Sequence, residues 1–285
     1  MTAARQPIAH AKPAKDAPLS RLLAMRRPLV MGVLNVTPDS FSDGGKFLDP
    51  DRAIAQAWRM IEDGADIIDI GAESSRPYGG QRPVDQDDEQ SRLEPILGKV
   101  VAIGVPVSID TMKAEVADWA LGHGATIAND VWGLQRYPDM AGVVAAHGVP
   151  VIVMHNRDAA DPAIDIMADM EAFFTSSLAI ADRAGVARHH IVLDPGIGFG
   201  KTPEQSMTAI RELGRLKRFG LPILVGASRK RFINSVVPSE PDRRIGGSIA
   251  SHLLAVEHGA AIVRVHDVAE TVQALRVAAA IGRPQ

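Results

Sequence analysis

The sequence predicts a single (β/α)8 TIM barrel, a ring of eight parallel strands surrounded by helices. Three observations lead to this fold class. Short apolar runs alternate with longer segments of helical spacing. The alternation repeats about eight times over about 250 residues, the size of such a barrel. Polar side chains follow nearly every apolar run, as in a barrel whose βα loops form one functional face. A doubly wound open sheet is the structural alternative, and it would place a nucleotide site in one crevice.

The individual elements can be assigned from this alternation. Strands are predicted at 29–34, 67–70, 105–109, 125–128, 149–154, 191–193, 223–225 and 261–263. Helices are predicted at 51–63, 86–102, 112–122, 139–147, 165–184, 203–217, 229–236, 242–258 and 267–281. Glycines such as Gly64, Gly148 and Gly185 follow helical segments at C-cap positions. No long polar linker separates the units, so we expect a parallel sheet with helices outside.

The composition is that of one globular domain with a short tail. The chain has 285 residues, of which 46% are hydrophobic and 23% charged. Residues 1–25 are rich in Ala, Pro and Lys and lack the apolar centre of a signal peptide. We predict a disordered N-terminal tail over 1–25, although the part near Leu22 and Leu23 can pack, and a barrel domain over 26–285.

The charge and the cysteine content exclude several classes of partner and of chemistry. The net charge of −3 and the pI of about 6.3 do not indicate binding to nucleic acid or to an anionic membrane. No apolar run approaches the roughly 20 residues of a membrane span. The absence of cysteine excludes disulfides, thiol catalysis and cysteine-ligated metals. It fits a reducing compartment, and we expect a cytoplasmic protein.

The stretch from Asp194 to Thr202 is the most informative segment. A short apolar run ends at Asp194, and Pro195 then cannot donate a ladder hydrogen bond. Three glycines follow and allow the backbone to approach a ligand closely. Thr202 and Pro203 are typical of a helix start, as N-cap and first helical residue. The alternative for this segment alone is an ordinary βα turn with a capping Asp.

Lys201 in this stretch resembles the lysine of a phosphate-binding P-loop. The P-loop pattern is incomplete, because Asp194 or Pro195 stands where its first glycine would be. We therefore expect that ATP does not bind and that Lys201→Ala keeps most activity.

Polar residues at the strand ends are expected to converge on one mouth. They are Asn35, Glu73, Asp110, Asn129, Asp130, His155, Asp194, Ser228, Arg229, Lys230, Arg264 and His266. Each alone can be explained as a cap or turn former. Amide and carboxylate groups on three separate strands, Asp110, Asn129 and Asp194, suit a flat heterocycle with a donor and acceptor edge.

Basic residues in the predicted loops and strand ends indicate an anionic substrate. They are Arg76, Lys230, Arg231, Arg264 and His266, in a chain whose net charge is negative. Arg264 interrupts an apolar strand, so its side chain is expected to point into the mouth. For Arg231, a solvated helix face is an equally good explanation.

Two long loops, loop 1 over 35–46 and loop 2 over 71–83, are candidate lids over the C-terminal face of the barrel. Both contain Gly, Ser and Pro, and each carries a single aromatic residue, Phe41 or Tyr78. Disorder without function is the alternative for both loops.

Together these motifs resemble those of the dihydropteroate synthase family, the pterin-binding enzymes of folate biosynthesis. The matching segments are 32–45, 73–77, 108–111, 129–131, 194–202, 228–230 and 264–268. The combination is highly specific, although no single motif is. The chain departs from the family pattern at Ala72, usually Gly, and at Ser75, usually Thr. These departures concern the shape of the p-aminobenzoate pocket and not the reaction.

The resemblance implies an activity and a set of site residues. The reaction would condense 6-hydroxymethyl-7,8-dihydropterin pyrophosphate with p-aminobenzoate, giving 7,8-dihydropteroate and pyrophosphate with the help of Mg²⁺. The implied pterin-binding residues are Asp110, Asn129, Asp194, Lys230 and Arg264. Asn35 would ligate Mg²⁺ and, with Arg76 and His266, hold the pyrophosphate. Phe41, Ser75, Pro77 and Arg231 would bind p-aminobenzoate. The implied catalytic residues are Asp110, Lys230, Arg264 and His266.

Two other functions remain as alternatives. A methyltetrahydrofolate methyltransferase would share the pterin contacts but depend on a corrinoid protein. A non-catalytic pterin or folate binding protein would bind the heterocycle without turnover. The partners expected from the family are the small-molecule substrates and a second copy in a homodimer. Apolar residues of the last two helical units, Leu253, Leu254, Leu275 and Val277, are either that interface or barrel-facing core.

Overall fold

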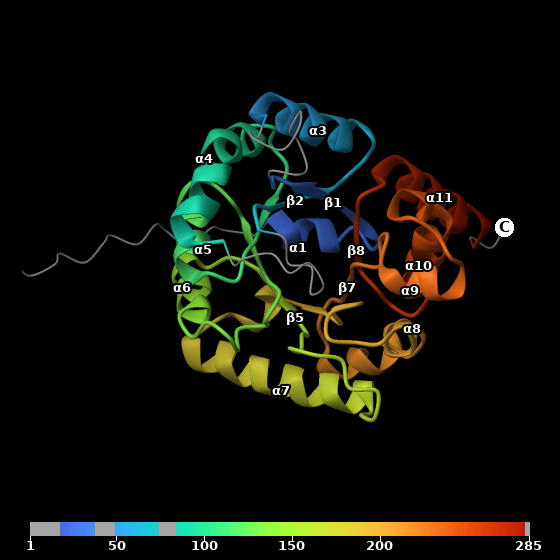
Figure 1. The fold of residues 1–285 in the computed structure, drawn as a ribbon. Helices are drawn as coiled ribbons and strands as arrows, with labels where there is room; N and C mark the ends of the chain where they lie inside the picture. Colours follow the sequence, from blue (N-terminus) through green and yellow to red (C-terminus); the bar gives the residue numbers. More distant parts are fainter. Residues whose placement is uncertain (1–17, 38–48, 74–83, 283–285) are drawn as a thin grey trace, which may run out of the picture.

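The computed structural model describes residues 18–37, 49–73 and 84–282, and these form a closed barrel with an outer ring of helices (Figure 1). All strand pairs are parallel, in the order β6-β5-β4-β3-β2-β1-β8-β7. A parallel bridge between Leu193 and Ile223 brings β6 and β7 together at the ends of this order. The predicted (β/α)8 fold is therefore confirmed, and the open doubly wound sheet is excluded.

The observed elements agree closely with the predicted ones. The strands are β1 (Leu29–Asn35), β2 (Ile67–Gly71), β3 (Val107–Asp110), β4 (Ile127–Asp130), β5 (Val151–Met154), β6 (Ile191–Asp194), β7 (Leu224–Val225) and β8 (Ile262–Val265). The α-helices are α1 (Pro18–Leu23), α3 (Pro50–Glu62), α4 (Gln86–Val101), α5 (Ala114–Gly122), α6 (Met140–His147), α7 (Ile166–Ala184), α8 (Pro203–Arg211), α9 (Arg231–Val236), α10 (Ile245–Glu257) and α11 (Val268–Ile281). Short 3₁₀ helices are η1 (Arg188–His190), η2 (Leu213–Phe219) and η3 (Pro241–Arg243).

One predicted helix is divided in the structure. The segment predicted at 203–217 forms α8 and then the 3₁₀ helix η2, because Glu212 leaves the helical conformation with a φ of −101°. Gly214 lies two residues later, and glycine is a poor helix former. The chain therefore tightens into a 3₁₀ turn that ends at Gly220, where φ is +65°.

The side chains inside the barrel change from apolar near the amino ends of the strands to polar near their carboxyl ends. The lower layer of the interior is an apolar cluster to which nearly every strand contributes; the strand residues are Leu29, Met31, Ile67, Ile127, Ile152, Val192, Leu224 and Ile262. Side chains of a strand that face the same side are two residues apart. The next inward positions, toward the strand ends, are therefore open to polar residues, and two larger apolar clusters join the outer faces of the strands to the helices.

Helix α1 lies in the part of the N-terminal segment, near Leu22 and Leu23, that was expected to be able to pack. Leu19 is 3% exposed and belongs to the lower interior cluster, with Leu22 and Leu23 packed against it. The helix lies across the centre of the ring in Figure 1. It covers the apolar layer at the amino ends of the strands, so burial of Leu19 orders this part of the chain. Residues 1–17 lie outside the described residues.

In the described part of the chain, no helix is both long enough and apolar enough to cross a membrane.

Candidate active site

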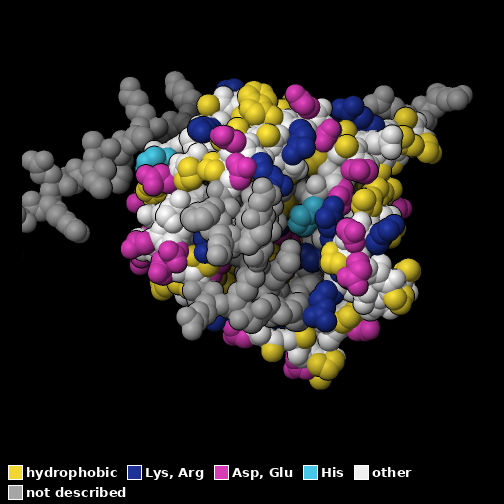
Figure 2. Space-filling view, turned by 45° about the horizontal axis from the view of Figure 1, so that its top comes forward, with side chains coloured by type: hydrophobic (Ala, Val, Ile, Leu, Met, Phe, Trp, Pro, Cys, Tyr) yellow, Lys and Arg dark blue, Asp and Glu magenta, His cyan; other side chains and the backbone are white. Residues whose placement is uncertain are grey.

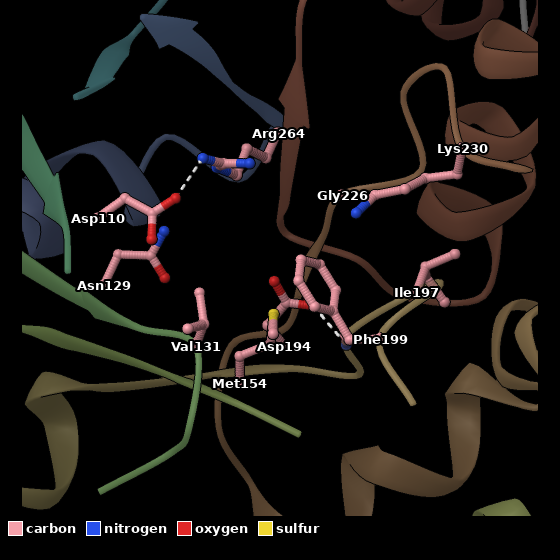
Figure 3. A pocket seen from close by; sticks show the side chains of 11 residues that line it. Asp110, Asn129, Val131, Met154, Asp194, Ile197, Phe199, Gly226, Lys230 and Arg264 are labelled. Atoms are coloured by element: carbon pink, nitrogen blue, oxygen red, sulfur yellow. Dashed lines mark hydrogen bonds and ion pairs between the residues drawn. The ribbon is translucent and has the colours of Figure 1, made fainter. Parts of the chain in front are cut away.

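The pocket at the carboxyl ends of the strands contains all five residues predicted to bind a heterocycle. Its lining residues are Asp110, Asn129, Val131, Met154, Asp194, Gly196, Ile197, Phe199, Gly226, Lys230 and Arg264. Figure 3 shows the polar side chains pointing toward a common space from different strands. The two-residue period of a strand explains this convergence. Three of the side chains each follow an inward apolar residue by two positions and so point inward as well: Asn129, Asp194 and Arg264.

Arg264 joins two buried carboxylates across the barrel. Its Nη2 donates to Asp110 at 2.7 Å and its Nε donates to Asp69 at 2.6 Å. Burial alone would lower the pKa of Arg264, but the two carboxylates outweigh this effect and raise it. Arg264 is therefore a permanent cation whose side chain is only 19% exposed.

Asp110 lies in an environment that opposes its charge. Burial, together with the neighbouring Asp69 and Glu89, raises its pKa to about 7, although Arg264 acts to lower it. The ionised form of such a buried carboxylate is stabilised by any positive charge that is placed next to it. Asp110 is thus suited to stabilise a cationic ring.

Asp194 is oriented by the backbone that follows it. One oxygen accepts a hydrogen bond from the Gly196 N–H at 2.7 Å, and Figure 3 shows the other turned toward the pocket. Burial raises the pKa of Asp194 to about 6, while the Gly196 hydrogen bond and Lys230 lower it. The turn requires glycine, because Gly196 has a φ of +62° and a Cβ there would lie 2.0 Å from the backbone oxygen of His155.

Lys201 supports this turn from behind the pocket. It is 2% exposed, and its Nζ donates to the carbonyl oxygens of Gly196 at 3.0 Å and Phe199 at 3.1 Å. A third contact joins Nζ to Nδ1 of His155 at 2.6 Å. Thr202 then begins α8 with a capping box, as predicted. Lys201 therefore contacts protein groups within the turn, and its burial indicates a structural role. That Lys201→Ala keeps most activity and that ATP does not bind stay predictions.

Lys230 reaches into the pocket from the turn after β7. Its Nζ lies 4.0 Å from the centre of the Phe199 ring, a cation–π contact. The preceding Arg229 has a φ of +57° and forms an ion pair with Asp267. Its N–H also donates to Ser248 Oγ at 2.9 Å, so the turn that carries Lys230 is held from two sides.

His266 is a neutral imidazole beside the pocket. Burial lowers its pKa to about 3, and the nearby cations Arg264, Arg229 and Lys230 add to this effect. The Ser228 hydroxyl oxygen accepts from the backbone N–H of His266 at 3.2 Å and lies 3.0 Å from its Nδ1. The hydroxyl can donate its proton to Nδ1, which leaves Nε2 as the protonated donor nitrogen.

The remaining predicted residues divide into two groups. Asn35 is the last residue of β1 and is half-buried, and Arg231 is the exposed first residue of α9. Phe41, Ser75, Arg76 and Pro77 lie outside the described residues, as do most of loops 1 and 2. Among the residues that are described, no cluster of three or more His, Asp or Glu side chains could hold a metal by itself.

The described ends of loop 2 are joined by an ionic cluster. Glu73 accepts from the Val84 N–H at 3.1 Å, and Lys113 donates to Glu73 at 2.5 Å. Lys113 also donates to the fully buried Glu89 at 2.6 Å. Glu73 was predicted at the mouth; it does not line the ring pocket, and its carboxylate is paired with Val84 N–H and Lys113.

Asp69 is the site residue that sequence analysis missed. It was read as part of an apolar strand, yet it is fully buried and contacts both Arg264 and Asn129. The signal was present, because a lone carboxylate within an apolar run of a buried parallel strand must have a partner.

This combination of a barrel and a mouth lined by carboxylates, an amide and cations defines the class of pterin-binding enzymes. The family described as pterin binding enzyme matches residues 31–266 of the chain.

Individual relatives narrow the class further. The dihydropteroate synthase of Bacillus subtilis (strain 168) is 46% identical over 262 residues, which cover 92% of this chain and 89% of the relative. The crystal structure of the dihydropteroate synthase of Clostridium difficile in the presence of pteroic acid has a TM-score of 0.86. It is 48% identical and covers 91% of this chain and 98% of its own. The structure of the Xanthomonas albilineans dihydropteroate synthase with 4-aminobenzoic acid has a TM-score of 0.86 and is 42% identical. The match covers 90% of this chain and 94% of that one. The chain belongs to the dihydropteroate synthase family of transferases.

Proposed function

We propose that the mouth pocket binds the ring of 6-hydroxymethyl-7,8-dihydropterin pyrophosphate and that this substrate is condensed there with p-aminobenzoate. The products are 7,8-dihydropteroate, a precursor of folate, and pyrophosphate. The observation that carries the proposal is the convergence of Asp110, Asn129, Asp194, Lys230 and Arg264 in one pocket. The relatives point to the same reaction, since their ligands include pteroic acid and 4-aminobenzoic acid.

The ring would be recognised by its edge and its face. Asp194 offers the ring a carboxylate oxygen, which accepts N–H groups of an aminopyrimidine edge. Asn129 faces the same space from β4. The planar guanidinium of Arg264 can stack on the ring, because its ion pairs with Asp69 and Asp110 hold it at the pocket wall.

The bond that breaks joins the pterin methylene carbon to a pyrophosphate oxygen. Its electron pair leaves with pyrophosphate, and positive charge develops on the methylene and spreads over the ring. Ionised Asp110 stabilises this charge in a site that is largely closed to water. The aniline nitrogen of p-aminobenzoate is neutral at pH 7, attacks the methylene, and then loses a proton. A strong general base is not required for this attack.

The leaving group would be held by the residues beside the ring site. His266 can donate Nε2–H to a pyrophosphate oxygen, since Ser228 occupies its Nδ1. Asn35 fits an Mg²⁺ ion that is bound mainly by the pyrophosphate, because Mg²⁺ takes few protein oxygens and an amide oxygen suits it. When bound, Mg²⁺ neutralises charge on the departing pyrophosphate. Arg76 is proposed as a further pyrophosphate contact.

The p-aminobenzoate site is proposed from the family resemblance. Phe41, Ser75 and Pro77 lie on loops 1 and 2, outside the described residues. Arg231 directly follows Lys230 and is exposed at the start of α9, where a cation can meet a carboxylate that enters from solvent.

A homodimer is proposed from the surface of α9, α10 and α11. The large exposed apolar residues of these helices and of the turn after α9 are Val236, Val237, Leu254, Val277 and Ile281. Leu254 is 49% exposed, whereas the neighbouring Leu253 and Leu275 are half-buried. From the sequence, these residues could belong either to the core or to a subunit interface. Their exposure favours an interface at Leu254 and Val277. Light scattering coupled to size-exclusion chromatography would measure the mass in solution.

Nucleic acid and membranes are not proposed as partners. Figure 2 shows Lys and Arg side chains interspersed with Asp and Glu over the described part of the face that it presents. Nucleic-acid binding uses a continuous basic surface. The cysteine-free composition is consistent with the cytoplasm, which we propose as the location.

Pyrophosphate release provides the test of the reaction. We expect release from dihydropterin pyrophosphate to depend on p-aminobenzoate and to proceed without any corrinoid protein. Binding of the pterin without turnover would support a non-catalytic binding protein instead. Transfer of a methyl group to a corrinoid would support the methyltransferase.

A further inference from the structure

Asp69 lies one layer below the ring-binding residues and is not part of the pocket lining. It is the third residue of β2, pairs in register with Val33 and Ser108, and is 0% exposed. Gly71, two residues later, occupies the register position beside Asp110. Because Asp69 is fully buried, it does not border the space that a ligand in the pocket would fill.

Asp69 nevertheless contacts two pocket residues at once. One oxygen accepts from Nε of Arg264 at 2.6 Å. Both oxygens lie within hydrogen-bond distance of Nδ2 of Asn129, at 3.4 and 3.3 Å. These contacts join β2 to β4 and β8 through side chains alone.

The chemistry of Asp69 determines which end of the Asn129 amide faces the pocket. A carboxylate that is ion-paired, as Asp69 is with Arg264, only accepts hydrogen bonds. The NH₂ group of Asn129 must therefore point to Asp69, and the amide oxygen must point to the pocket. Figure 3, which does not draw Asp69, shows the Asn129 nitrogen on the side of Asp110 and the oxygen turned away from Asp110.

Two acceptors consequently face the ring edge. The free oxygen of Asp194 is one, and the amide oxygen of Asn129 is the other. A ring edge with N–H donors satisfies both of them, whereas a carbonyl at the same place would leave buried acceptors unpaired.

We propose that Asp69 is a positioning residue that determines substrate selectivity by holding Asn129 as an acceptor. The inference rests on the proposed function of the pocket in pterin binding. Asp69 does not touch the ring. It acts through Asn129, whose amide could otherwise present either its oxygen or its NH₂ group to the ring.

The test compares pterin, which carries an amino group at C2, with lumazine, which carries a carbonyl there. Calorimetry would give the ratio of their dissociation constants for the wild-type chain and for Asp69→Asn. The wild type should prefer pterin by about 100-fold or more. In Asp69→Asn the new amide can donate or accept, so Asn129 can rotate and offer NH₂ to the lumazine carbonyl. We expect the preference to fall by about 10-fold.

Asp130→Asn is the matched control. Asp130 is also a buried carboxylate, 1% exposed, and it accepts from the backbone N–H groups of Trp132 and Leu134 at 2.9 and 2.7 Å. Its replacement removes a buried charge from β4 without touching Asp69. It should lower stability and leave the pterin to lumazine ratio unchanged.

The outcomes separate this inference from the proposed function. If the wild type does not bind pterin, the proposed function is wrong. If pterin is preferred but Asp69→Asn, still folded, keeps the full preference, the role of Asp69 is wrong. If Asp69→Asn does not fold, Asn129→Ala answers the question, because it removes the acceptor while Asp69 stays paired with Arg264. An unchanged ratio in Asn129→Ala would also overturn the inference.

Discussion

Lys201 Nζ lies 2.6 Å from Nδ1 of His155, and both side chains are buried behind the ring-binding pocket. Nε2 of His155 is 2.9 Å from Asp169 on α7. Burial lowers the pKa of His155 to about 3, and Lys201 lowers it further, so the imidazole is neutral. It donates from Nε2 to Asp169 and accepts at Nδ1 from Lys201. The turn that shapes the pocket is thereby connected to the outer helix α7.

The first prediction concerns Lys201→Ala. The change removes the donor to the Phe199 carbonyl oxygen and one of two donors to the Gly196 carbonyl oxygen, which also accepts from the Phe199 N–H. We expect a loss of roughly 2–4 kcal/mol in the free energy of unfolding. Pterin affinity should fall as well, since Phe199 lines the pocket. Urea unfolding and calorimetry would measure the two effects. Lys99→Ala, at a side chain that is 61% exposed, is the control and should change neither. Unaltered stability in Lys201→Ala would contradict the structural role.

The second prediction concerns Gly196→Ala and its control Gly148→Ala. Both glycines have left-handed backbone, with φ of +62° and +63°. Nothing lies within 4 Å of a Cβ at Gly148, whereas a Cβ at Gly196 would meet the backbone oxygen of His155 at 2.0 Å. Gly148→Ala should cost about 1–2 kcal/mol of stability from the backbone conformation alone. Gly196→Ala should cost clearly more, because backbone must move. Equal shifts of the two midpoints in thermal unfolding would refute this.

The third prediction concerns Asp194→Asn. The substitution replaces an acceptor by an amide that presents a donor to the ring edge or to the Gly196 N–H. One buried polar group is then left unpaired in either orientation. Pterin binding should weaken by roughly 2–4 kcal/mol. Calorimetry with a pterin would show the loss, and an unchanged affinity would remove Asp194 from the site.

The fourth prediction is a pH dependence set by Asp110. Its carboxyl has a pKa raised to about 7, and only the ionised form stabilises a cationic ring. Since protonation removes the function, kcat/KM should fall as the pH decreases through about 7. The decline should steepen near pH 6, where Asp194 also takes up a proton. In Asp110→Asn the decline near pH 7 should disappear, with activity lower by about 100-fold. A profile of Asp110→Asn that still bends at pH 7 would assign the transition to another group.

The fifth prediction concerns Asn35 and Mg²⁺. If Asn35 ligates the ion together with pyrophosphate, Asn35→Ala should raise the Mg²⁺ concentration needed for half-maximal activity by about 10-fold. Binding of a pterin without pyrophosphate should be unaffected, since Asn35 does not line the ring pocket. Titration of activity with Mg²⁺ after treatment with a chelator would measure the effect. An identical Mg²⁺ dependence in the variant would exclude Asn35 as a ligand.

The sequence by itself determined the fold class and the residues of the pocket. Strand and helix periods differ, so the eightfold alternation could be read directly, and a parallel sheet places all strand ends on one face. Asp110, Asn129 and Asp194 could be named because Asp110 and Asp194 end their strands and Asn129 is one residue from the end of its own. The family motifs then supplied the reaction.

The tertiary structure decided which of the polar residues face the substrate and which support it. Asp69 and Lys201 are 132 residues apart in the numbering, and their partners come from other strands and helices. No local pattern shows that Asp69 turns the Asn129 amide, that Lys201 holds a turn, or that Glu73 pairs with Lys113. These roles depend on distances of about 3 Å between elements that meet only when the barrel closes.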